Sequence, residues 1–321
     1  MKNNVFFAKI ASCFVFIFLM SACSTVVTEL PYDIKIIERD LLPEMVFIPG
    51  GQVQVGTNDK PEYSRYYCLP KKETRLNAFY ISKAVIPMRL FKQFLAETSY
   101  SYYTGKLEDM GPVEKYLVSD MSPAIFMNWY EAILFCNWLS RKDKLEPVYM
   151  LDEQAVRRSG EGDHFSTRVV WNKKANGYRL PTIAEWDYAI LSEGTLVDEM
   201  KKNPWKGLIV LGKDSRYDRI NTIEEGGFKN RFGVLGYFGG VNRDGLYPTI
   251  GEWMWETGNP KYVGSEKKDP KTEKYISVTT GIFGETRVTR WLSNDEYYSL
   301  VSELASWYGG FITIRVVRNA K

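Results

Sequence analysis

The sequence predicts an α+β protein that is rich in loops and low in regular secondary structure. Three short stretches have helical spacing, and the apolar runs between them are short and interrupted by glycine and proline. Aromatic residues make up 15% of the chain, a high share that is expected where side-chain packing, rather than long regular elements, holds many loops. We find no internal repeat and no break in composition sharp enough to mark a second domain.

The N-terminus is predicted to be a processing segment. Lys2 and Lys9 accompany an apolar run, residues 10–20, that is too short to span a bilayer of roughly 30 Å as a helix. The run leads through small residues into Cys23, which is typical of a bacterial lipoprotein signal with lipid on that sulfur. Residues 1–22 are therefore predicted to be a lipoprotein signal peptide, 23–43 a lipidated N-terminus and tether, and 44–321 the folded domain. The alternatives are an ordinary secretory signal beside an idle Cys23 and a transmembrane anchor, which the lack of flanking charge disfavours.

The first elements of the folded domain are predicted to be strands. Residues 46–56 hold two short apolar runs around a Pro-Gly-Gly turn, which predicts a hairpin, and residues 79–82 form a further short strand. Pro87 suits the first turn of a helix, whose apolar face is then Leu90, Phe91, Phe94 and Leu95.

Two capping patterns predict two more helices. Asn128 is a good N-cap, and Glu131 is placed to return a hydrogen bond to the cap. Thr182 and Glu185 repeat the arrangement further along the chain. The inner face of the helix after Asn128 is predicted to be Trp129, Ala132, Ile133, Cys136 and Leu139. From residue 207 onward no convincing helix is predicted.

Charge, cysteine and histidine exclude several classes of function. Loss of residues 1–22 removes Lys2 and Lys9 and lowers the formal net charge from +3 to +1, without a basic stripe, so a nucleic-acid partner is not expected. Cys68 and Cys136 are predicted to be buried free thiols rather than a disulfide. The single histidine, His164, lies in a polar stretch and is predicted to be an exposed loop residue, which argues against a histidine-rich metal centre.

Motifs follow one another in a fixed order along residues 44–318. The longest is residues 176–189, NGYRLPTIAEWDYA. The others are residues 45–51 (MVFIPGG), 79–87 (FYISKAVIP), 128–140 (NWYEAILFCNWLS), 147–149 (PVY), 242–256, 287–290 (RVTR) and 314–318 (IRVVR). Together they resemble the formylglycine-generating enzyme (sulfatase-modifying factor) family over essentially the whole predicted domain.

The resemblance implies a C-type-lectin-like fold with a ligand surface built largely from C-terminal loops. It also implies an oxidase that uses two cysteines in the segment after Arg290. This chain has no cysteine after Cys136, and the two reactive positions fall at about Glu296 and Val301. Trp291 also stands where the family has a flexible glycine, and no other side chain replaces a thiolate in cysteine chemistry. The chain is therefore expected to be a family scaffold without cysteine-oxidase activity.

Other polar residues of the motifs have structural interpretations. Arg179 and Glu185 are predicted to cap and pin a helix start rather than to form a site. Glu252 is the one convincing ligand left for the calcium that the resemblance makes possible. Glu256 and Glu296 remain open as a carboxylate pair for hydrolysis. The tryptophans of the motifs are predicted to be core residues: Trp129, Trp138, Trp186, Trp253 and Trp255.

Three functions remain open from the sequence. The first is a cell-envelope lipoprotein whose catalytically silent domain binds a protein or glycan, or acts as a scaffold, through a surface that includes Tyr297, Tyr298, Trp307 and Tyr308. The second is an enzyme of the family type with a displaced active site, and the third is a purely structural envelope protein. The family that the chain resembles includes both lipoproteins and hypervariable display proteins. Ser24 after the lipidation site mildly favours the outer membrane.

Overall fold

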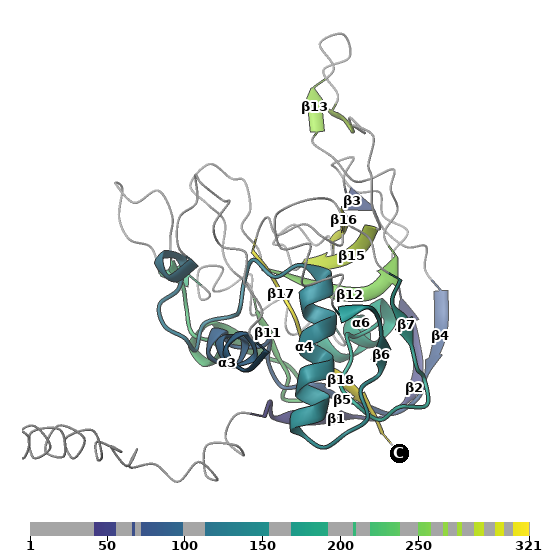
Figure 1. Cartoon of the computed structure of the whole chain (residues 1–321). Helices are drawn as coiled ribbons and strands as arrows, with labels where there is room; N and C mark the ends of the chain where they lie inside the picture. Colours follow the sequence, from purple (N-terminus) through teal and green to yellow (C-terminus); the bar gives the residue numbers. More distant parts are fainter. Residues whose placement is uncertain are drawn as a thin grey trace, which may run out of the picture. The chain divides into compact units, whose positions relative to one another are not determined.

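A three-stranded antiparallel sheet brings together distant parts of the chain in this computed structural model (Figure 1). The structure describes residues 42–55, 66–67, 72–98, 113–153, 168–191, 208–209, 219–237, 250–257, 266–268, 275–277, 286–291, 299–304 and 311–320. The sheet has the order β1 (Met45–Ile48), β5 (Phe79–Ser82), β18 (Val317–Asn319). The side chains on its inner face are buried: Ile48, Phe79, Ile81 and Val317. Phe47, on the outer face, is 50% exposed. This alternation is what an antiparallel sheet with one solvated face requires.

The predicted hairpin over residues 46–56 is wrong. β1 pairs with β5, and β2 (Gly51–Val55) pairs instead with β4 (Lys72–Leu76), so the two apolar runs belong to successive ladders. Gly50 lies at the bend between the ladders, where an added Cβ would come within 2.7 Å of the Leu76 carbonyl oxygen. The Pro-Gly-Gly sequence therefore permits two segments of the chain to cross closely, rather than forming a tight turn.

A second, five-stranded sheet carries the C-terminal part of the chain. Its order is β17 (Ile312–Thr313), β12 (Gly251–Thr257), β15 (Thr286–Trp291), β16 (Ser299–Leu304), β3 (Tyr66–Tyr67). β12 and β17 are parallel and the other pairs are antiparallel. The register between β12 and β15 shifts between Trp253 and Thr257, so β12 bulges there.

The three predicted helices are confirmed. They are α3 (Met88–Thr98), directly after Pro87, α4 (Trp129–Lys142) and α6 (Ile183–Leu191). α3 buries Leu90, Phe91 and Phe94, while Leu95 is half-buried. α4 differs from the amphipathic prediction, because every residue from Trp129 to Ser140 is buried. A helix that is apolar nearly all round is a central core helix, and Figure 1 shows α4 crossing the domain.

Both predicted capping arrangements are present. The Asn128 side chain accepts a hydrogen bond from the Glu131 amide at 2.8 Å, and the Glu131 carboxylate accepts one from the Asn128 amide at 2.9 Å. At α6, the Glu185 amide donates to the Thr182 hydroxyl, and the Glu185 carboxylate accepts from the Thr182 amide. These bonds satisfy amide groups that a helix start leaves without helical partners.

Substitution of Asn128 by alanine is expected to lower the free energy of unfolding by about 1–2 kcal/mol, because the buried Glu131 amide loses its acceptor. Asn128→Ser keeps a capping oxygen and serves as the matched control. Urea unfolding of both variants checks this, and equal stability of Asn128→Ala and Asn128→Ser would refute the role of the cap.

The remaining regular structure is made of short pieces. Two-stranded ribbons join β6 (Tyr149–Met150) to β7 (Val170–Trp171), β8 (Leu208–Ile209) to β9 (Arg219–Ile220), β10 (Gly227–Lys229) to β11 (Leu235–Tyr237), and β13 (Glu266–Lys268) to β14 (Tyr275–Ser277). A 3₁₀ turn, η1, covers Val113–Tyr116. One-turn α8 (Ile223–Gly226), capped by Thr222, corrects the expectation of no helix after residue 207. The α+β, loop-rich class is confirmed. Among the described helices, none is long and apolar enough to cross a membrane.

The core lies between the first sheet, α6 and β12. It includes Ile81, Trp186, Met254 and Val317. Four of the five tryptophans predicted to be core residues are buried, whereas Trp255 is only partly buried. Cys136 is a buried free thiol, as predicted, and burial raises the pKa of that thiol far above its usual range. Cys68 and His164 lie outside the described residues.

Candidate functional site

The two positions of the missing cysteine pair are predicted at about Glu296 and Val301, and Val301 belongs to β16, which pairs with β15. The backbone of Val301 is in the interior strand β16, paired with Thr289 of β15 on one side and with Tyr66 of edge strand β3 on the other. Glu296 belongs to residues 292–298, which lie outside the described ranges. Valine has no acid–base, redox or ligating group, so the reaction implied by the resemblance has no counterpart at position 301.

One end of the five-stranded sheet brings the C-terminal segments together. Gly251 pairs with Trp291 in β15 and with Ile312 in β17, and Trp291 pairs with Ser299 in β16. We call this row of Ile312, Gly251, Trp291 and Ser299 the loop end of the sheet. With neighbouring strands about 4.8 Å apart, the row is about 14 Å wide.

The residues predicted to form a ligand surface are joined to the loop end by the chain. Tyr297 and Tyr298 directly precede Ser299, and Trp307 and Tyr308 lie a few residues before Ile312. All four lie outside the described residues, so their own placement stays a prediction. The described strands fix both ends of the first segment, at Trp291 and Ser299, and the C-terminal end of the second, at Ile312, to this row.

A buried aromatic cluster fixes the loop end. The Gly251 amide donates a hydrogen bond to the Phe311 carbonyl at 2.9 Å. The Phe311 ring lies 5.7 Å from that of Tyr116 and 5.6 Å from that of Phe126. Phe126 has a φ of 60°, which is unfavourable for a bulky side chain. Strained backbone of this kind persists where surrounding packing determines it, and such positions cluster at functional sites.

Glu252, the predicted calcium ligand, is part of an ion pair in the core. Arg315 donates from Nε to Glu252 Oε2 at 2.9 Å and from Nη2 to Oε1 at 3.1 Å, and Trp186 Nε1 donates to Oε2 at 2.8 Å. Further bonds from Arg315 reach the carbonyl oxygens of Ser82 and Leu235. Both charged side chains are almost fully buried. The carboxylate therefore neutralises a buried guanidinium and ties β12 to the first sheet.

Arg179 and Glu185 form the second buried ion pair, as predicted. The bidentate contacts are 2.7 Å and 2.6 Å long, and Asn319 Oδ1 accepts from the same guanidinium at 2.8 Å. Burial alone would raise the pKa of Glu185, but the charge of Arg179 and its hydrogen bonds hold that pKa below its usual range. The pair pins the start of α6 to β18.

Arg287 contacts two tryptophans next to the bulge in β12. Its guanidinium is 3.8 Å from the ring centre of Trp129 and 5.1 Å from that of Trp255, and Nη1 donates to the Trp255 carbonyl at 2.8 Å. Trp255 also stacks on Tyr149, with ring centres 5.2 Å apart. These cation–π and stacking contacts hold β15 against α4.

Glu256 is a described carboxyl group whose pKa is raised toward neutrality by its surroundings. Its two oxygens share the Ile183 amide at the start of α6, at 3.0 and 3.1 Å. Burial raises the pKa of Glu256 to about 7, and the negative charges of Glu185 and Asp187 add to the rise. Its proposed partner Glu296 lies outside the described residues, so the predicted carboxylate pair stays a prediction.

The described residues hold no group of three or more histidine, cysteine, aspartate or glutamate side chains that could bind a metal ion. The sequence analysis missed the partners of Glu252 and Glu256. A signal for the first was present, because a lone arginine inside the apolar run Ile314–Val317 requires a buried partner. For the second there was no such signal, since a backbone amide is the partner of Glu256.

Comparisons with known proteins give the family and the fold of this chain. The family model for the sulfatase-modifying factor enzyme 1-like domain matches residues 33–306. The chain is 30% identical over 172 residues to the chaperone protein LppX of Paenibacillus barcinonensis, covering 53% of this chain and 49% of that protein. It is 27% identical over 249 residues to the formylglycine-generating enzyme of Bos taurus, covering 68% of this chain and 62% of the enzyme. The chain thus spans about half to three fifths of the length of these relatives.

A solved structure shows the same fold. The crystal structure of CarF superimposes with a TM-score of 0.52 at 21% identity, covering 88% of this chain and all of that one. The matched family model includes both β12 and the β15–β16 hairpin. The chain belongs to the sulfatase-modifying factor enzyme 1-like family, in which it is similar to the formylglycine-generating enzymes.

Proposed function

We propose that this chain is a cell-envelope lipoprotein whose domain binds a protein or glycan, or acts as a scaffold, through the segments at the loop end of the sheet. The observation that carries the proposal is the row of Ile312, Gly251, Trp291 and Ser299. Residues 292–298, with Tyr297 and Tyr298, join this row at both ends, and the segment with Trp307 and Tyr308 joins it at Ile312. A rigid sheet end with loops rich in aromatic side chains is a favourable base for recognition.

The chemistry of the reactive positions supports binding rather than oxidation. Val301 takes part in the sheet ladder on both sides, and the chain has no cysteine beyond Cys136. A relative that matches half of the chain is named a chaperone, which is a function based on binding. Two buried ion pairs, Arg315–Glu252 and Arg179–Glu185, supply the rigid frame that such a surface needs.

The proposal is tested by capturing envelope and host-surface proteins and arrayed glycans with the full chain purified in detergent. A variant with Tyr297, Tyr298, Trp307 and Tyr308 changed to alanine is expected to lose a partner that the unchanged chain retains. A second variant with Phe47→Ala and Met150→Ala removes exposed apolar surface elsewhere and is expected to keep it. Unfolding curves establish that both variants are folded. Equal capture by all three proteins would contradict a binding surface at the loop end.

The lipid anchor has its own test. Cys23→Ser is expected to abolish the incorporation of fatty acid into the protein, because it removes the sulfur that would carry the acyl chains of the anchor. Fractionation of cells that express either form, with detection of incorporated labelled fatty acid, measures this. Fatty acid retained in Cys23→Ser would contradict lipidation at Cys23. Placement in the outer membrane, favoured by Ser24, would be visible in separated inner and outer membranes.

An enzyme with a displaced active site is the alternative, and Glu256 favours it. A carboxyl group with a pKa of about 7 can give or take a proton near neutrality, as general acid–base catalysis requires. Under this alternative, turnover of a cysteine-containing or hydrolysable substrate would be lost in Glu256→Gln and kept in the four-alanine variant. The binding proposal predicts instead that Glu256→Gln still captures the partner and that the four-alanine variant does not.

A further inference from the structure

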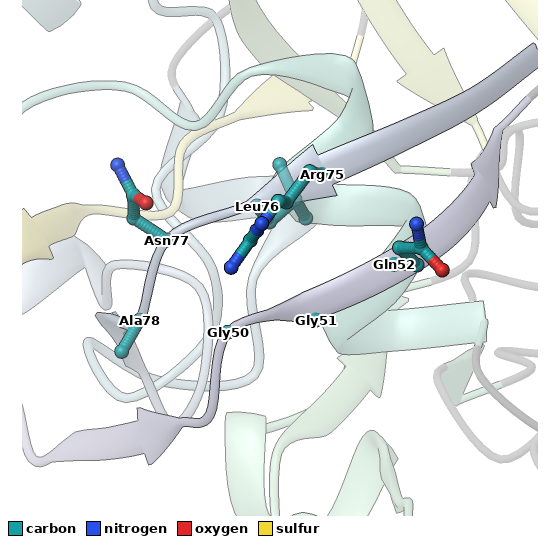
Figure 2. A pocket seen from close by; sticks show the side chains of 7 residues that line it. All are labelled: Gly50, Gly51, Gln52, Arg75, Leu76, Asn77 and Ala78. Atoms are coloured by element: carbon teal, nitrogen blue, oxygen red, sulfur yellow. The ribbon is translucent and has the colours of Figure 1, made fainter.

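A hollow lies at the bend where the two N-terminal ladders meet. It has a volume of about 510 Å³ and is lined by residues 50–52 on one side and residues 75–78 on the other. Figure 2 shows the side chains of Gln52, Arg75 and Asn77 around it. We call it the bend hollow. It is separate in sequence from the loop end of the sheet and from the predicted positions of the cysteine pair.

The backbone builds the bend hollow. An added Cβ at Gly50 would lie 2.7 Å from the Leu76 carbonyl oxygen and 2.8 Å from the Ala78 amide nitrogen. Two chain segments thus cross at a distance that only glycine allows. β2 rests on α6, with Gly51 near the Tyr188 hydroxyl. The floor of the hollow is therefore fixed by backbone packing rather than by mobile side chains.

The polar side chains around the bend hollow have no partners within the described part of the protein. Arg75 is exposed and opposite Gln52 in the β2–β4 ladder, and Asn77 follows β4. No described hydrogen bond or ion pair involves the Arg75 guanidinium or the amide groups of Gln52 and Asn77. Some other cations on described segments are paired, as in Lys83–Glu44, Lys92–Asp120 and Arg141–Glu153, so the Arg75 guanidinium remains available to a ligand at the hollow where those three do not.

We propose that the bend hollow binds an acidic saccharide, a sugar ring that carries a carboxylate. A guanidinium offers two parallel N–H donors that match a carboxylate. Each primary amide supplies donors and an acceptor, which suits sugar hydroxyl groups that do both. The volume is within the range of small-ligand pockets. A peptide ligand is less suited, because apolar pockets for its side chains are missing from this lining.

The test uses the full chain in detergent and three probes: a trimer of galacturonate, the matching trimer of galactose, and a tetrapeptide of glutamate. Calorimetry or NMR titration is expected to show binding of the galacturonate trimer and about tenfold weaker binding of the galactose trimer, because the charge-assisted bonds to Arg75 are lost. Arg75→Gln is expected to weaken binding of the galacturonate trimer about tenfold as well.

Arg89→Gln removes an exposed arginine on α3 and is the matched control, expected to leave affinity unchanged. The double variant Gln52→Ala with Asn77→Ala is expected to weaken the binding of both the galacturonate and the galactose trimer. The proposal is overturned if the galacturonate trimer does not bind, if both trimers bind equally, or if the peptide binds more tightly than the galacturonate trimer. It is also overturned if Arg75→Gln leaves the affinity for the galacturonate trimer unchanged. The four-alanine variant of the loop end should bind the galacturonate trimer normally, so this site and the loop-end proposal succeed or fail separately.

Discussion

Substitution of Arg315 by methionine is expected to lower the free energy of unfolding by about 3–5 kcal/mol. Among the described residues, the substitution leaves the Trp186 indole as the remaining donor to the buried Glu252 carboxylate, and it removes the bonds to the Ser82 and Leu235 carbonyls. An unpaired buried carboxylate is costly because it has lost both water and its counter-charge. Urea or thermal unfolding of the purified protein measures the change.

The double variant Arg315→Met with Glu252→Met separates this effect from simple loss of packing. Removal of both charges is expected to recover most of the lost stability, because apolar replacement of a whole buried pair is often close to neutral. Arg318→Met is the control for a partly exposed pair, since Arg318 is 3.5 Å from Asp143, and it is expected to change stability by less than about 1 kcal/mol. A double variant no more stable than Arg315→Met would contradict the ion-pair account.

The unchanged protein is expected to lose stability as pH rises from about 5 to about 7, and substitution of Glu256 by glutamine is expected to remove this loss. The pKa of Glu256 is raised to about 7 in the folded protein by burial and by nearby Glu185 and Asp187. Between its ordinary pKa and 7, the folded state binds the proton more tightly than the unfolded chain does. The free energy of unfolding therefore falls with rising pH over this window, by about 1–3 kcal/mol.

Denaturation at pH 5, 6, 7 and 8 tests this prediction. At pH 5 Glu256→Gln and the unchanged protein should be similar, and at pH 8 the variant should be the more stable. Glu224→Gln removes an exposed carboxylate from α8 and should leave the pH dependence of the unchanged protein intact. Parallel stability curves for Glu256→Gln and the unchanged protein would contradict a raised pKa at Glu256.

The parts of the fold that local chemistry determines were predictable from the sequence. The caps at Asn128 and Thr182 were visible because capping needs particular residue types at fixed spacing. The pairing of β1 was not, because the Pro-Gly-Gly sequence is equally consistent with a turn and with a close crossing, and only the partner strand decides between them. The complete burial of α4 also depends on its neighbours rather than on its own periodicity.

The arrangement of the candidate site could not be predicted from the sequence, and its four aromatic residues stay a prediction. The absence of the cysteine pair was readable from the sequence, whereas the role of Glu252 depends on Arg315, 63 residues away. The raised pKa of Glu256 depends on its burial against the start of α6, for which a sequence has no signal. The bend hollow likewise arises from a crossing of two strands that no local pattern specifies.

The most direct test of the central claim, a family scaffold without cysteine chemistry, is an oxidase assay. The full chain is loaded with copper, incubated with a cysteine-containing sulfatase peptide and oxygen, and the peptide is analysed by mass spectrometry beside the bovine formylglycine-generating enzyme as positive control. We predict that the peptide cysteine remains unconverted, because the chain has no cysteine after Cys136 and the two reactive positions are predicted to fall at about Glu296 and Val301. Copper-dependent formation of formylglycine by this protein would contradict the account.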